Sequence, residues 1–487
     1  MNVQEKIMKK IKKSLQLSVA SLLVAVSLVS GSLAVNAAED IMEITAAEGY
    51  TVAESYRPKA SIVIDSQTGK VIWDDNSDEQ MSIASLSKVM TAYLAFEAME
   101  QGKYTLETAL QPSETIINIS QIYSLSNNKM MAGVDYTVSD LMYLIFMPSS
   151  NAATVMLANH TSDNDEAAFI NSMNAKAKEL GMSNTVYYNA TGATSSSFLG
   201  YYNPVGIDPD GENISTARDL SILIYNLLKK YPQVLEFTKN ATHTVHPGQI
   251  SEETFESYLF ALPGKKYAYE GFDGIKTGSS PSAGFGFVGT AKREDTRLIE
   301  VILGVGDWTD QAGEEERHPT GNALLDRGFA GYEYKKILDK GEQVINDQKI
   351  TLEADFYDFV PKDKEVTYEL IDNKLAVVSD LPQVSDKIAE NTIPFKGKVT
   401  NKDKEKEPES AAKPGKGSKN KNYLVPILLT IIGIALSVIA TFVKPPRQGR
   451  RHSGGSSLGN MLLILGLLVV ITGIGLGIAI NLNLLSL

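Results

Sequence analysis

Ser85 stands three residues before Lys88 in the stretch SIASLSKVMTAYLAFEAM (residues 82–99), which has the apolar pattern of a helix. A serine hydroxyl becomes a nucleophile when a neighbouring base takes its proton, and a neutral lysine can be that base. At i and i+3 near a helix start the two side chains face the same way, and the helix dipole favours an oxyanion at the serine. The spacing alone is not specific, because it recurs at Ser126–Lys129, Ser410–Lys413 and Ser418–Lys421.

Two later segments carry groups that suit the same chemistry. Pro148-Ser149-Ser150-Asn151 follows a helix expected over 138–147 and provides a hydroxyl and an amide two residues apart. Lys276-Thr277-Gly278 falls late in an expected strand, where a glycine lets a substrate backbone approach closely. Each segment also has an ordinary explanation, as a helix start, a helix cap or a strand end with an exposed lysine. Their order along the chain favours one shared site.

These segments resemble the three signatures of the penicillin-binding serine transferases, here SLSK, SSN and KTG. Within that group the chain resembles the low-molecular-mass D-alanyl-D-alanine carboxypeptidases, over roughly residues 40–340. Their local phrases recur at residues 84–88, 148–151, 213–219, 271–278 and 322–326. The resemblance implies an α+β penicillin-binding/β-lactamase-like transpeptidase fold, in which helices and a helical lobe flank an antiparallel sheet. It also implies release of the terminal D-alanine from peptidoglycan stem pentapeptides, with β-lactam antibiotics as covalent inhibitors.

The resemblance further implies catalytic roles for five residues. Ser85 attacks the carbonyl between two D-alanines and forms an acyl-enzyme, while Lys88 takes the proton. Lys88 must be neutral to do so, and burial together with the charge of Lys276 would lower its pKa. Ser149 would relay a proton to the leaving amine. Asn151 would donate to the substrate amide and position Lys88.

Four more residues are expected to bind the substrate. The Thr277 hydroxyl and the Lys276 charge suit a carboxylate, beside Gly278, and the backbone N–H groups of Ser85 and Ser279 would form the oxyanion hole. Arg317 stands at the family's arginine position, and its planar guanidinium also suits a carboxylate. The acidic run Glu314–Glu316 next to it supports the alternative that Arg317 makes a surface ion pair.

Two other functions use the same signatures. A β-lactamase needs a carboxylate that activates the deacylating water, but Glu166 and Asn171 fall in an expected helix over 166–180 rather than in a loop. A non-catalytic wall-binding membrane scaffold would not need every signature side chain, and all of them are present.

Metal and Ser-His-Asp chemistry is disfavoured. The chain has five histidines, and His243-x-x-His246 lies in an alternating polar segment that is typical of a surface strand. There is no cysteine, which excludes thiol nucleophiles and disulfides. No cofactor is expected. The net charge is −12, and removal of the +4 carried by five Lys and one Glu in residues 1–37 makes it about −16, which argues against a nucleic-acid partner.

Strand patterns at both ends of a helical middle predict a sheet built from the two ends of one α+β domain, residues 39–340. Strands are expected within 61–73, 271–277, 284–292 and 297–305, and a helix near 321–334. Helix starts are expected at Thr137, with a capping box to Asp140, and at residues 215–219. Residues 341–400 are expected to form a small β-rich domain.

The ends of the chain predict export and membrane anchoring. Residues 1–38 have the basic start, apolar run and small-residue site of a signal peptide. After a charged tether over 401–422, the apolar runs 423–443 and 461–481 are long enough to form a transmembrane hairpin. The loop between them, 444–460, holds four basic residues and no acid, so it is expected to be cytoplasmic, with the catalytic domain outside the cell.

Overall fold

The computed structural model describes residues 39–397. The expected signal peptide, the tether and both expected membrane spans lie outside these residues. Within residues 39–397, no helix is long and apolar enough to cross a membrane.

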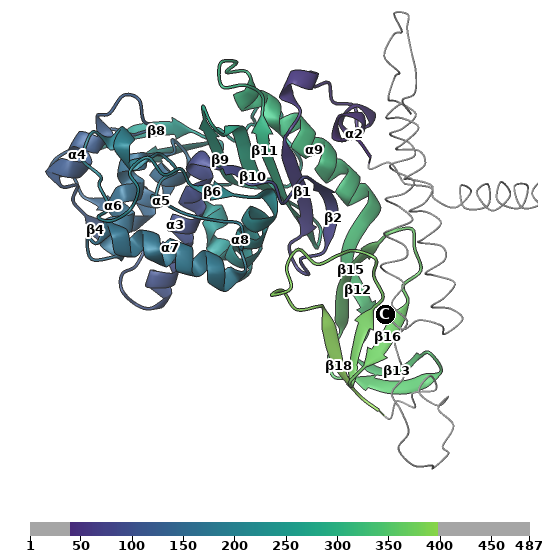
Figure 1. Ribbon diagram of the computed structural model, residues 1–487. Coiled ribbons are helices and arrows are strands. Elements are labelled where there is room, and N and C mark those ends of the chain that lie inside the picture. Colours follow the sequence, from purple (N-terminus) through teal and green to yellow (C-terminus); the bar gives the residue numbers. More distant parts are fainter. Residues whose placement is uncertain (1–38, 398–487) are drawn as a thin grey trace, which may run out of the picture. The chain divides into compact units, whose positions relative to one another are not determined.

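A five-stranded antiparallel sheet lies at the centre of the catalytic part (Figure 1). Its order is β2-β1-β11-β10-β9, so strands from the beginning and the end of this part lie side by side. The strands are β1 (Ala60–Asp65), β2 (Val71–Asp75), β9 (Phe272–Ser280), β10 (Gly284–Arg293) and β11 (Thr296–Val305). β1 pairs with β11 from Ala60 opposite Leu303 to Asp65 opposite Leu298. The predicted α+β sheet assembled from both ends is confirmed.

Helices cover both faces of this sheet. They are α2 (Ile41–Ala47), α3 (Lys88–Glu100), α4 (Glu114–Ser120), α5 (Val138–Phe146), α6 (Asn151–Thr161), α7 (Glu166–Leu180), α8 (Ala217–Lys230) and α9 (Gly313–Gly331). Figure 1 shows α2 and α9 on one side of the sheet and the lobe of α3 to α8 on the other. Side chains alternate across a strand, so Ile62 and Ile64 join the core with the lobe, whereas Val63 joins the core with α9.

The predicted helix starts are confirmed. Thr137 accepts from the backbone N–H of Asp140, and the Asp140 carboxylate accepts from the backbone N–H of Thr137, which makes the capping box of α5. Thr216 caps α8 in the same way by accepting from Asp219. α7 begins at Glu166, as expected.

Short elements connect these layers. The two-residue strands are β3 (Met81–Ser82), β4 (Ala109–Leu110), β5 (Tyr136–Thr137) and β6 (Ile214–Ser215), and β7 (Thr242–Val245) pairs with β8 (Glu253–Glu256). The 3₁₀ helices are η1 (Glu54–Tyr56), η2 (Ala84–Ser87), η3 (Ser195–Phe198) and η4 (Pro232–Phe237).

The helix expected over 321–334 begins earlier and ends earlier than predicted. α9 begins at Gly313 and continues through Pro319, a residue that usually breaks a helix. Pro319 has no N–H for the carbonyl of Glu315, and His318 Nδ1 lies 3.1 Å from that oxygen instead. Residues 332–334 are not helical, because Tyr332–Leu338 forms β12, which pairs with β15 (Phe356–Pro361).

A second antiparallel sheet follows, as the pattern of residues 341–400 predicted. Its order is β13-β14-β18-β17-β16, with β13 (Gly341–Ile345), β14 (Gln348–Leu352), β16 (Tyr368–Ile371), β17 (Lys374–Val377) and β18 (Thr392–Lys396). A small core lies within it, formed by Ile345, Ile350, Leu352, Phe356, Leu375 and Phe395.

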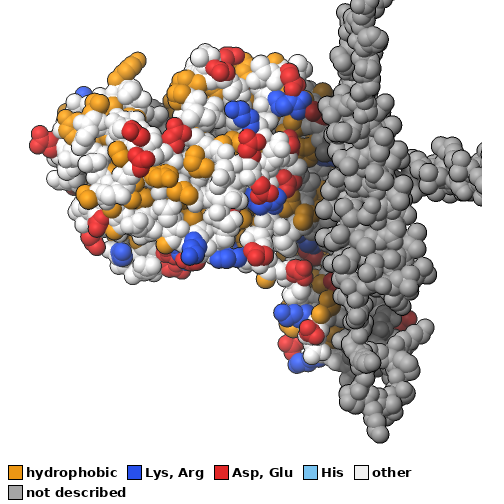
Figure 2. All heavy atoms as spheres, in the orientation of Figure 1, with side chains coloured by type: hydrophobic (Ala, Val, Ile, Leu, Met, Phe, Trp, Pro, Cys, Tyr) orange, Lys and Arg blue, Asp and Glu red, His pale blue; other side chains and the backbone are white. Residues whose placement is uncertain are grey.

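The β domain contacts the catalytic part through a buried ion pair and through exposed hydrogen bonds at a second place. Lys70 Nζ, from the turn between β1 and β2, lies 2.9 Å from Asp358 Oδ1 and 3.1 Å from the carbonyl oxygen of Phe359. Both side chains of this ion pair are almost completely buried. Lys387 Nζ donates to the carbonyl oxygens of Lys178 and Glu179 at the end of α7, at 3.0 and 2.9 Å. Outside this junction, Figure 2 shows basic and acidic side chains interspersed over the visible face.

The buried Lys70–Asp358 pair should dominate the stability of this junction. We expect Asp358→Asn, which leaves the lysine without its counter-charge, to lower the free energy of unfolding by about 3–5 kcal/mol. The double variant Lys70→Met/Asp358→Asn removes both charges and should regain most of that loss. Urea unfolding followed by circular dichroism measures both. An Asp358→Asn protein that unfolds at the wild-type urea midpoint would contradict this expectation.

Candidate active site

The turn that carries Ser85 is a 3₁₀ helix, η2, and not the first turn of an α-helix as predicted; α3 begins at Lys88. A 3₁₀ helix has three residues per turn, so i and i+3 side chains lie directly above each other. Lys88 Nζ is accordingly 2.9 Å from Ser85 Oγ. The turn contains an unusual backbone position, Ala84 at φ +44°, whose carbonyl accepts from the hydroxyl of Ser87 at 2.7 Å.

Lys88 is fully buried, with 0% of its surface exposed, and has two further oxygen partners. Its Nζ lies 3.0 Å from Asn151 Oδ1 and 2.8 Å from the carbonyl oxygen of Thr191. Asn151 Nδ2 donates to the carbonyl of Ser126 at 2.9 Å, so the orientation of the amide is fixed with its oxygen towards Lys88. The structure therefore brings Ser85, Lys88 and Asn151 together.

Burial and like charge favour the neutral form of both signature lysines. Burial, and secondly the charge of Lys276, hold the pKa of Lys88 well below its usual value. Burial, and secondly the charge of Arg317, lower the pKa of Lys276 to about 7, although Glu314 acts in the opposite direction. The two causes expected for Lys88 are the ones found.

The SSN segment divides into two serines with different environments. Ser150 is the N-cap of α6 and accepts from the backbone N–H of Ala153 at 3.1 Å. Ser149 precedes the helix at φ +61°, and its buried hydroxyl has no hydrogen-bond partner among the described residues. The helix-cap explanation thus applies to Ser150 only. Ser149 does not hydrogen-bond to Lys88 or Lys276, so its relay role stays a prediction.

The KTG segment lies in β9 beside β10, with Lys276 opposite Val288 and Gly278 opposite Gly286. Lys276 is fully buried and donates to the carbonyl of Thr277 at 3.1 Å, so the exposed-lysine alternative is wrong. A Cβ on Gly278 would lie 2.6 Å from the carbonyl oxygen of Ile83. The crowding that requires glycine here comes from the protein's own Ser85 turn, and the roles of Thr277 and Gly278 towards substrate stay predictions.

Arg317 is buried in α9, with 0% exposure, and the surface ion pair proposed as an alternative is wrong. Glu315 and Glu316 contact Lys266 instead. Arg317 Nη1 donates to Ser279 Oγ at 2.9 Å and to the carbonyl of Gly286 at 3.2 Å. Its guanidinium therefore lies against the residue that follows KTG, which keeps a carboxylate-binding role open.

Thr191 and Gly192 are parts of the site that the sequence did not reveal. Gly192 has φ +93°, and a Cβ there would be 1.8 Å from the carbonyl oxygen of Ala84, so only glycine fits against the Ser85 turn. Asn189 Oδ1 accepts from the backbone N–H of Thr191 at 3.1 Å and of Gly192 at 2.6 Å. An Asn-x-x-Gly sequence is a turn signal, but no spacing connects it with Lys88.

His246 is buried at 6% exposure rather than on a surface strand. Its Nδ1 lies 2.8 Å from Ser251 Oγ, and its Nε2 lies 3.4 Å from Asp140 Oδ2. The same Asp140 oxygen already accepts from the N–H and the hydroxyl of Thr137, so it serves the α5 cap. This Ser-His-Asp chain therefore has a structural explanation. In the described part of the chain, no group of three or more His, Cys, Asp or Glu side chains could hold a metal ion.

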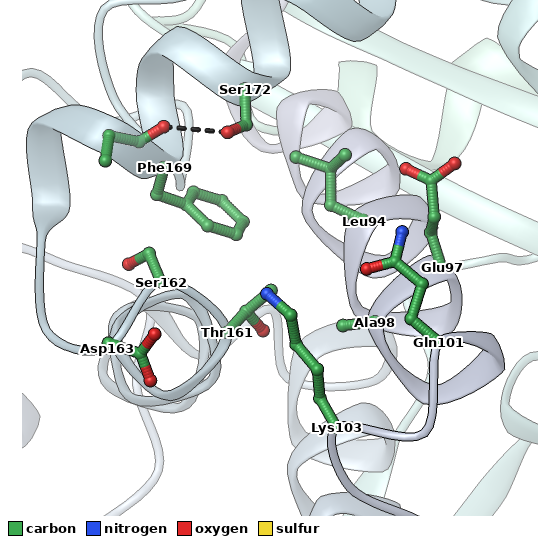
Figure 3. Close-up of a pocket in the computed structure, with 11 residues that line it drawn as sticks. Leu94, Glu97, Ala98, Gln101, Lys103, Thr161, Ser162, Asp163, Phe169 and Ser172 are labelled. Atoms are coloured by element: carbon green, nitrogen blue, oxygen red, sulfur yellow. Dashed lines mark hydrogen bonds between the residues drawn. The ribbon is translucent and has the colours of Figure 1, made fainter.

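A pocket of about 250 Å³ lies elsewhere in the lobe, between α3, α6 and α7 (Figure 3). Its polar groups include Glu97, Lys103 and Asp163, and the hydroxyl of Ser172 donates to the backbone of its own helix. None of the signature residues lines it. The reactive groups are therefore those around Ser85 and not those of this pocket.

Comparison with known proteins agrees with this geometry. The family model described as D-alanyl-D-alanine carboxypeptidase matches residues 46–307, and a domain of unknown function (DUF1958) matches residues 334–396. D-alanyl-D-alanine carboxypeptidase DacF of Bacillus subtilis is 30% identical over 302 residues, which cover 60% of this chain and 67% of DacF. DacC of Escherichia coli is 29% identical over 59% of this chain and 65% of its own length.

Solved structures show the same fold over a longer part of the chain. The peptidoglycan synthesis regulatory factor (PBP3) of Streptococcus pneumoniae superimposes with a TM-score of 0.60 at 26% identity, covering 71% of this chain and 98% of that one. Penicillin-binding protein 5 of Haemophilus influenzae has a TM-score of 0.55 at 23% identity, over 72% and 99%. These matches cover more residues than the catalytic part contains.

The two serines of SSN should separate reactivity from stability. We expect Ser149→Ala to lower the rate of β-lactam acylation at Ser85 by about 10²-fold or more, as loss of a proton-transfer group does, and to leave stability nearly unchanged. Ser150→Ala removes the α6 cap and should cost about 1 kcal/mol with a smaller effect on rate. Fluorescent-penicillin labelling and urea unfolding measure the two quantities. Equal rates for both variants would exclude a special role for Ser149.

Proposed function

The chain belongs to the D-alanyl-D-alanine carboxypeptidase family and is a serine-type enzyme with that activity, and we propose that it trims the terminal D-alanine from peptidoglycan stem pentapeptides. One observation carries the assignment of the nucleophile. Ser85 Oγ lies 2.9 Å from a fully buried lysine whose pKa is held well below its usual value. A neutral amine at this distance can accept the serine proton.

In the acylation step, Ser85 Oγ forms a bond to the carbonyl carbon between the two D-alanines while its proton moves to Lys88 Nζ. The backbone N–H groups of Ser85 and Ser279 stabilise the oxyanion. The peptide C–N bond then breaks, and the leaving amine takes the proton from Lys88 through the Ser149 hydroxyl. The unpartnered, buried state of that hydroxyl supports this relay.

In the deacylation step, water attacks the ester carbonyl and gives a proton to Lys88. The bond between the carbonyl carbon and Ser85 Oγ then breaks, and Oγ takes the proton from Lys88, which restores the free serine and the neutral lysine. A β-lactam acylates Ser85 through its ring carbonyl, but its amine stays attached to the adduct and is not released. We therefore propose β-lactams as covalent inhibitors.

Thr277, Lys276 and Arg317 are proposed to hold the terminal carboxylate of the substrate. Arg317 Nη1, 2.9 Å from Ser279 Oγ, supports a binding position at the end of β9. Lys276 contributes a full positive charge only below its pKa of about 7, whereas Arg317, with a pKa of about 10, stays charged at neutral pH.

The β-lactamase alternative is less well supported. Glu166 is the first residue of α7, accepts from the backbone N–H of Asn203 at 3.1 Å, and is not among the charges that act on Lys88. A non-catalytic scaffold would not explain the two buried lysines or the hydrogen bond of one of them to Ser85. Burying two lysines lowers the stability of the protein, so the pair is better explained by catalysis.

Release of D-alanine from diacyl-L-Lys-D-Ala-D-Ala tests the proposed reaction. The wild-type chain should release D-alanine, and Ser85→Ala should reduce release to the background rate while keeping the wild-type circular dichroism spectrum. A fluorescent penicillin should label the wild-type chain and remain bound for many minutes. Rapid turnover of penicillin would instead indicate a β-lactamase, and release by Ser85→Ala would overturn the assignment of the nucleophile.

We also infer the cellular arrangement from the sequence outside the described residues. A signal peptide over 1–38 exports the chain, and the runs 423–443 and 461–481 anchor it in the cell membrane, with the loop 444–460 inside. The catalytic domain (39–340) and the β domain (341–400) then act outside the membrane, where peptidoglycan lies, and the tether 401–422 connects them to the anchor.

Truncation tests this arrangement. In cells, the full chain should sediment with membranes, whereas a chain that ends at residue 400 should keep penicillin labelling but appear in the soluble extracytoplasmic fraction. Protease added to intact protoplasts should digest the catalytic domain. A full chain found in the soluble fraction, or protected from protease, would contradict the proposal.

A further inference from the structure

The number of N–H groups on Lys88 restricts how this base can point. A neutral amine has two N–H donors and one lone pair, whereas an ammonium has three donors and none. Two of the three partners of Lys88 are carbonyl oxygens, Asn151 Oδ1 and the Thr191 carbonyl, and these can only accept. If both oxygens receive an N–H, the lone pair must point at the third partner, Ser85 Oγ. This is the orientation that proton transfer from Ser85 needs.

The Thr191 carbonyl is held by a pair of buried asparagines. Asn189 Oδ1 closes the turn of residues 189–192 by accepting from the N–H groups of Thr191 and Gly192. The Asn213 side chain forms two hydrogen bonds with the backbone of Asn189. Its Nδ2 donates to the Asn189 carbonyl at 2.9 Å, and its Oδ1 accepts from the Asn189 N–H at 3.1 Å. The two asparagines are 0% and 1% exposed.

Asn213 also hydrogen-bonds to the turn that carries Ser85. Its Nδ2 lies 2.8 Å from Ser87 Oγ, and its carbonyl accepts from the N–H of Ile83 at 3.1 Å. Ser87 in turn donates to Ala84, the residue at positive φ just before the nucleophile. One side chain therefore connects the turn that carries Ser85 with the turn that presents Thr191.

We propose that Asn189 and Asn213 are positioning residues that fix the Thr191 carbonyl as an obligatory acceptor of Lys88, and so direct the lone pair of Lys88 at Ser85 Oγ. The proposal rests on the proposed function of Ser85 and Lys88. Neither asparagine hydrogen-bonds to Ser85 or Lys88, and both are buried, so their effect on Lys88 is exerted through the Thr191 carbonyl. Without that carbonyl, Lys88 can donate to Ser85 Oγ, and the lone pair then points away from the proton it must accept.

Loss of the acceptor has a second consequence for pH dependence. Hydrogen bonds from a charged donor are the stronger ones, so a carbonyl partner favours the ammonium over the neutral amine. Removal of the Thr191 carbonyl should therefore lower the pKa of Lys88 further. The groups that face Lys88 are the titratable Lys276 from β9, whose charge lowers the pKa of Lys88, and the neutral Asn151 from α6 and Ser85 from η2. None of these is altered.

Asn189→Ala in the full chain tests the proposal, with Asn174→Ala as the matched control. Asn174 binds the same loop, the one that follows α7. Its Oδ1 accepts from the N–H of Tyr187 and its Nδ2 donates to the carbonyl of Tyr187, both at 2.8 Å. It does not hydrogen-bond to Lys88 or to the 189–192 turn. The second-order rate of acylation by a fluorescent penicillin should fall by about 10- to 100-fold in Asn189→Ala, as for a displaced catalytic group. The acid limb of the pH–rate profile should move to lower pH. Asn174→Ala should stay within about threefold of wild type, with its acid limb unmoved.

Asn189→Asp keeps an acceptor for Thr191 and Gly192 and adds a buried negative charge near the lysine. It should recover much of the acylation rate above its acid limb, and the limb should move to higher pH because the charge favours the ammonium. Opposite shifts in the two Asn189 variants are not expected from a loss of stability alone. This variant also provides the test if Asn189→Ala does not fold.

Several outcomes would overturn the proposal. The first is an equal loss of acylation rate in Asn189→Ala and Asn174→Ala with no movement of the acid limb. The second is a wild-type acylation rate in Asn189→Ala. The third is an acid limb that does not move to higher pH in Asn189→Asp. Failure of the underlying function looks different, since the wild-type chain would then not be labelled, or Ser85→Ala would be labelled as well. In the expected result, Asn189→Ala reaches the same final labelling as wild type, only more slowly.

Discussion

The active site depends on a lysine that is buried without a carboxylate partner. Burying an ammonium is expensive, and a buried lysine usually either pairs with an acid or loses its proton. Lys70, at the junction with the β domain, is paired with Asp358. Lys88 is also buried, but it faces neutral oxygens and a second lysine, so its surroundings favour the neutral amine. The same residue type is thus a structural ion in one place and a base in the other.

Close backbone packing creates this environment. The sheet edge at β9, the 3₁₀ turn with Ser85 and the 189–192 turn approach each other so tightly that Gly278 and Gly192 have no room for a Cβ. Water is excluded from Lys88 by this packing, and this burial is the larger cause of its lowered pKa, ahead of the charge of Lys276. The order of the sheet makes this packing possible. β9 is an edge strand, so its unpaired edge is free to contact residues from the helical lobe.

Sequence patterns predicted the parts of this site that reside in side chains with known chemistry. Ser85, Lys88, Asn151 and Lys276 came from three short motifs. The alternation of apolar residues predicted the sheet around them. Long-range burial was not accessible in the same way. The acidic neighbours of Arg317 suggested a surface position, whereas the helix buries Arg317 and turns Glu315 and Glu316 towards Lys266. The sequence predicted a later start for α9, near residue 321. The contact of His318 Nδ1 with the Glu315 carbonyl, where Pro319 has no N–H to offer, is visible only in three dimensions. The Thr191 carbonyl is backbone, and a residue type says nothing about where its backbone oxygen points.

The loop between α7 and α8 connects this site with the rest of the molecule. At its beginning, Lys387 of the β domain donates to the last carbonyls of α7, next to Gly181, which takes a left-handed conformation to end the helix. Near its end, Asn213 holds the loop against the Ser85 turn. A loop of this length loses considerable conformational entropy when it becomes ordered. Because contacts at both ends already fix part of the loop, fewer of its residues must be ordered by contacts within the active site. The loop that presents the Thr191 carbonyl to Lys88 is therefore held by the β domain at its beginning and by the Ser85 turn near its end.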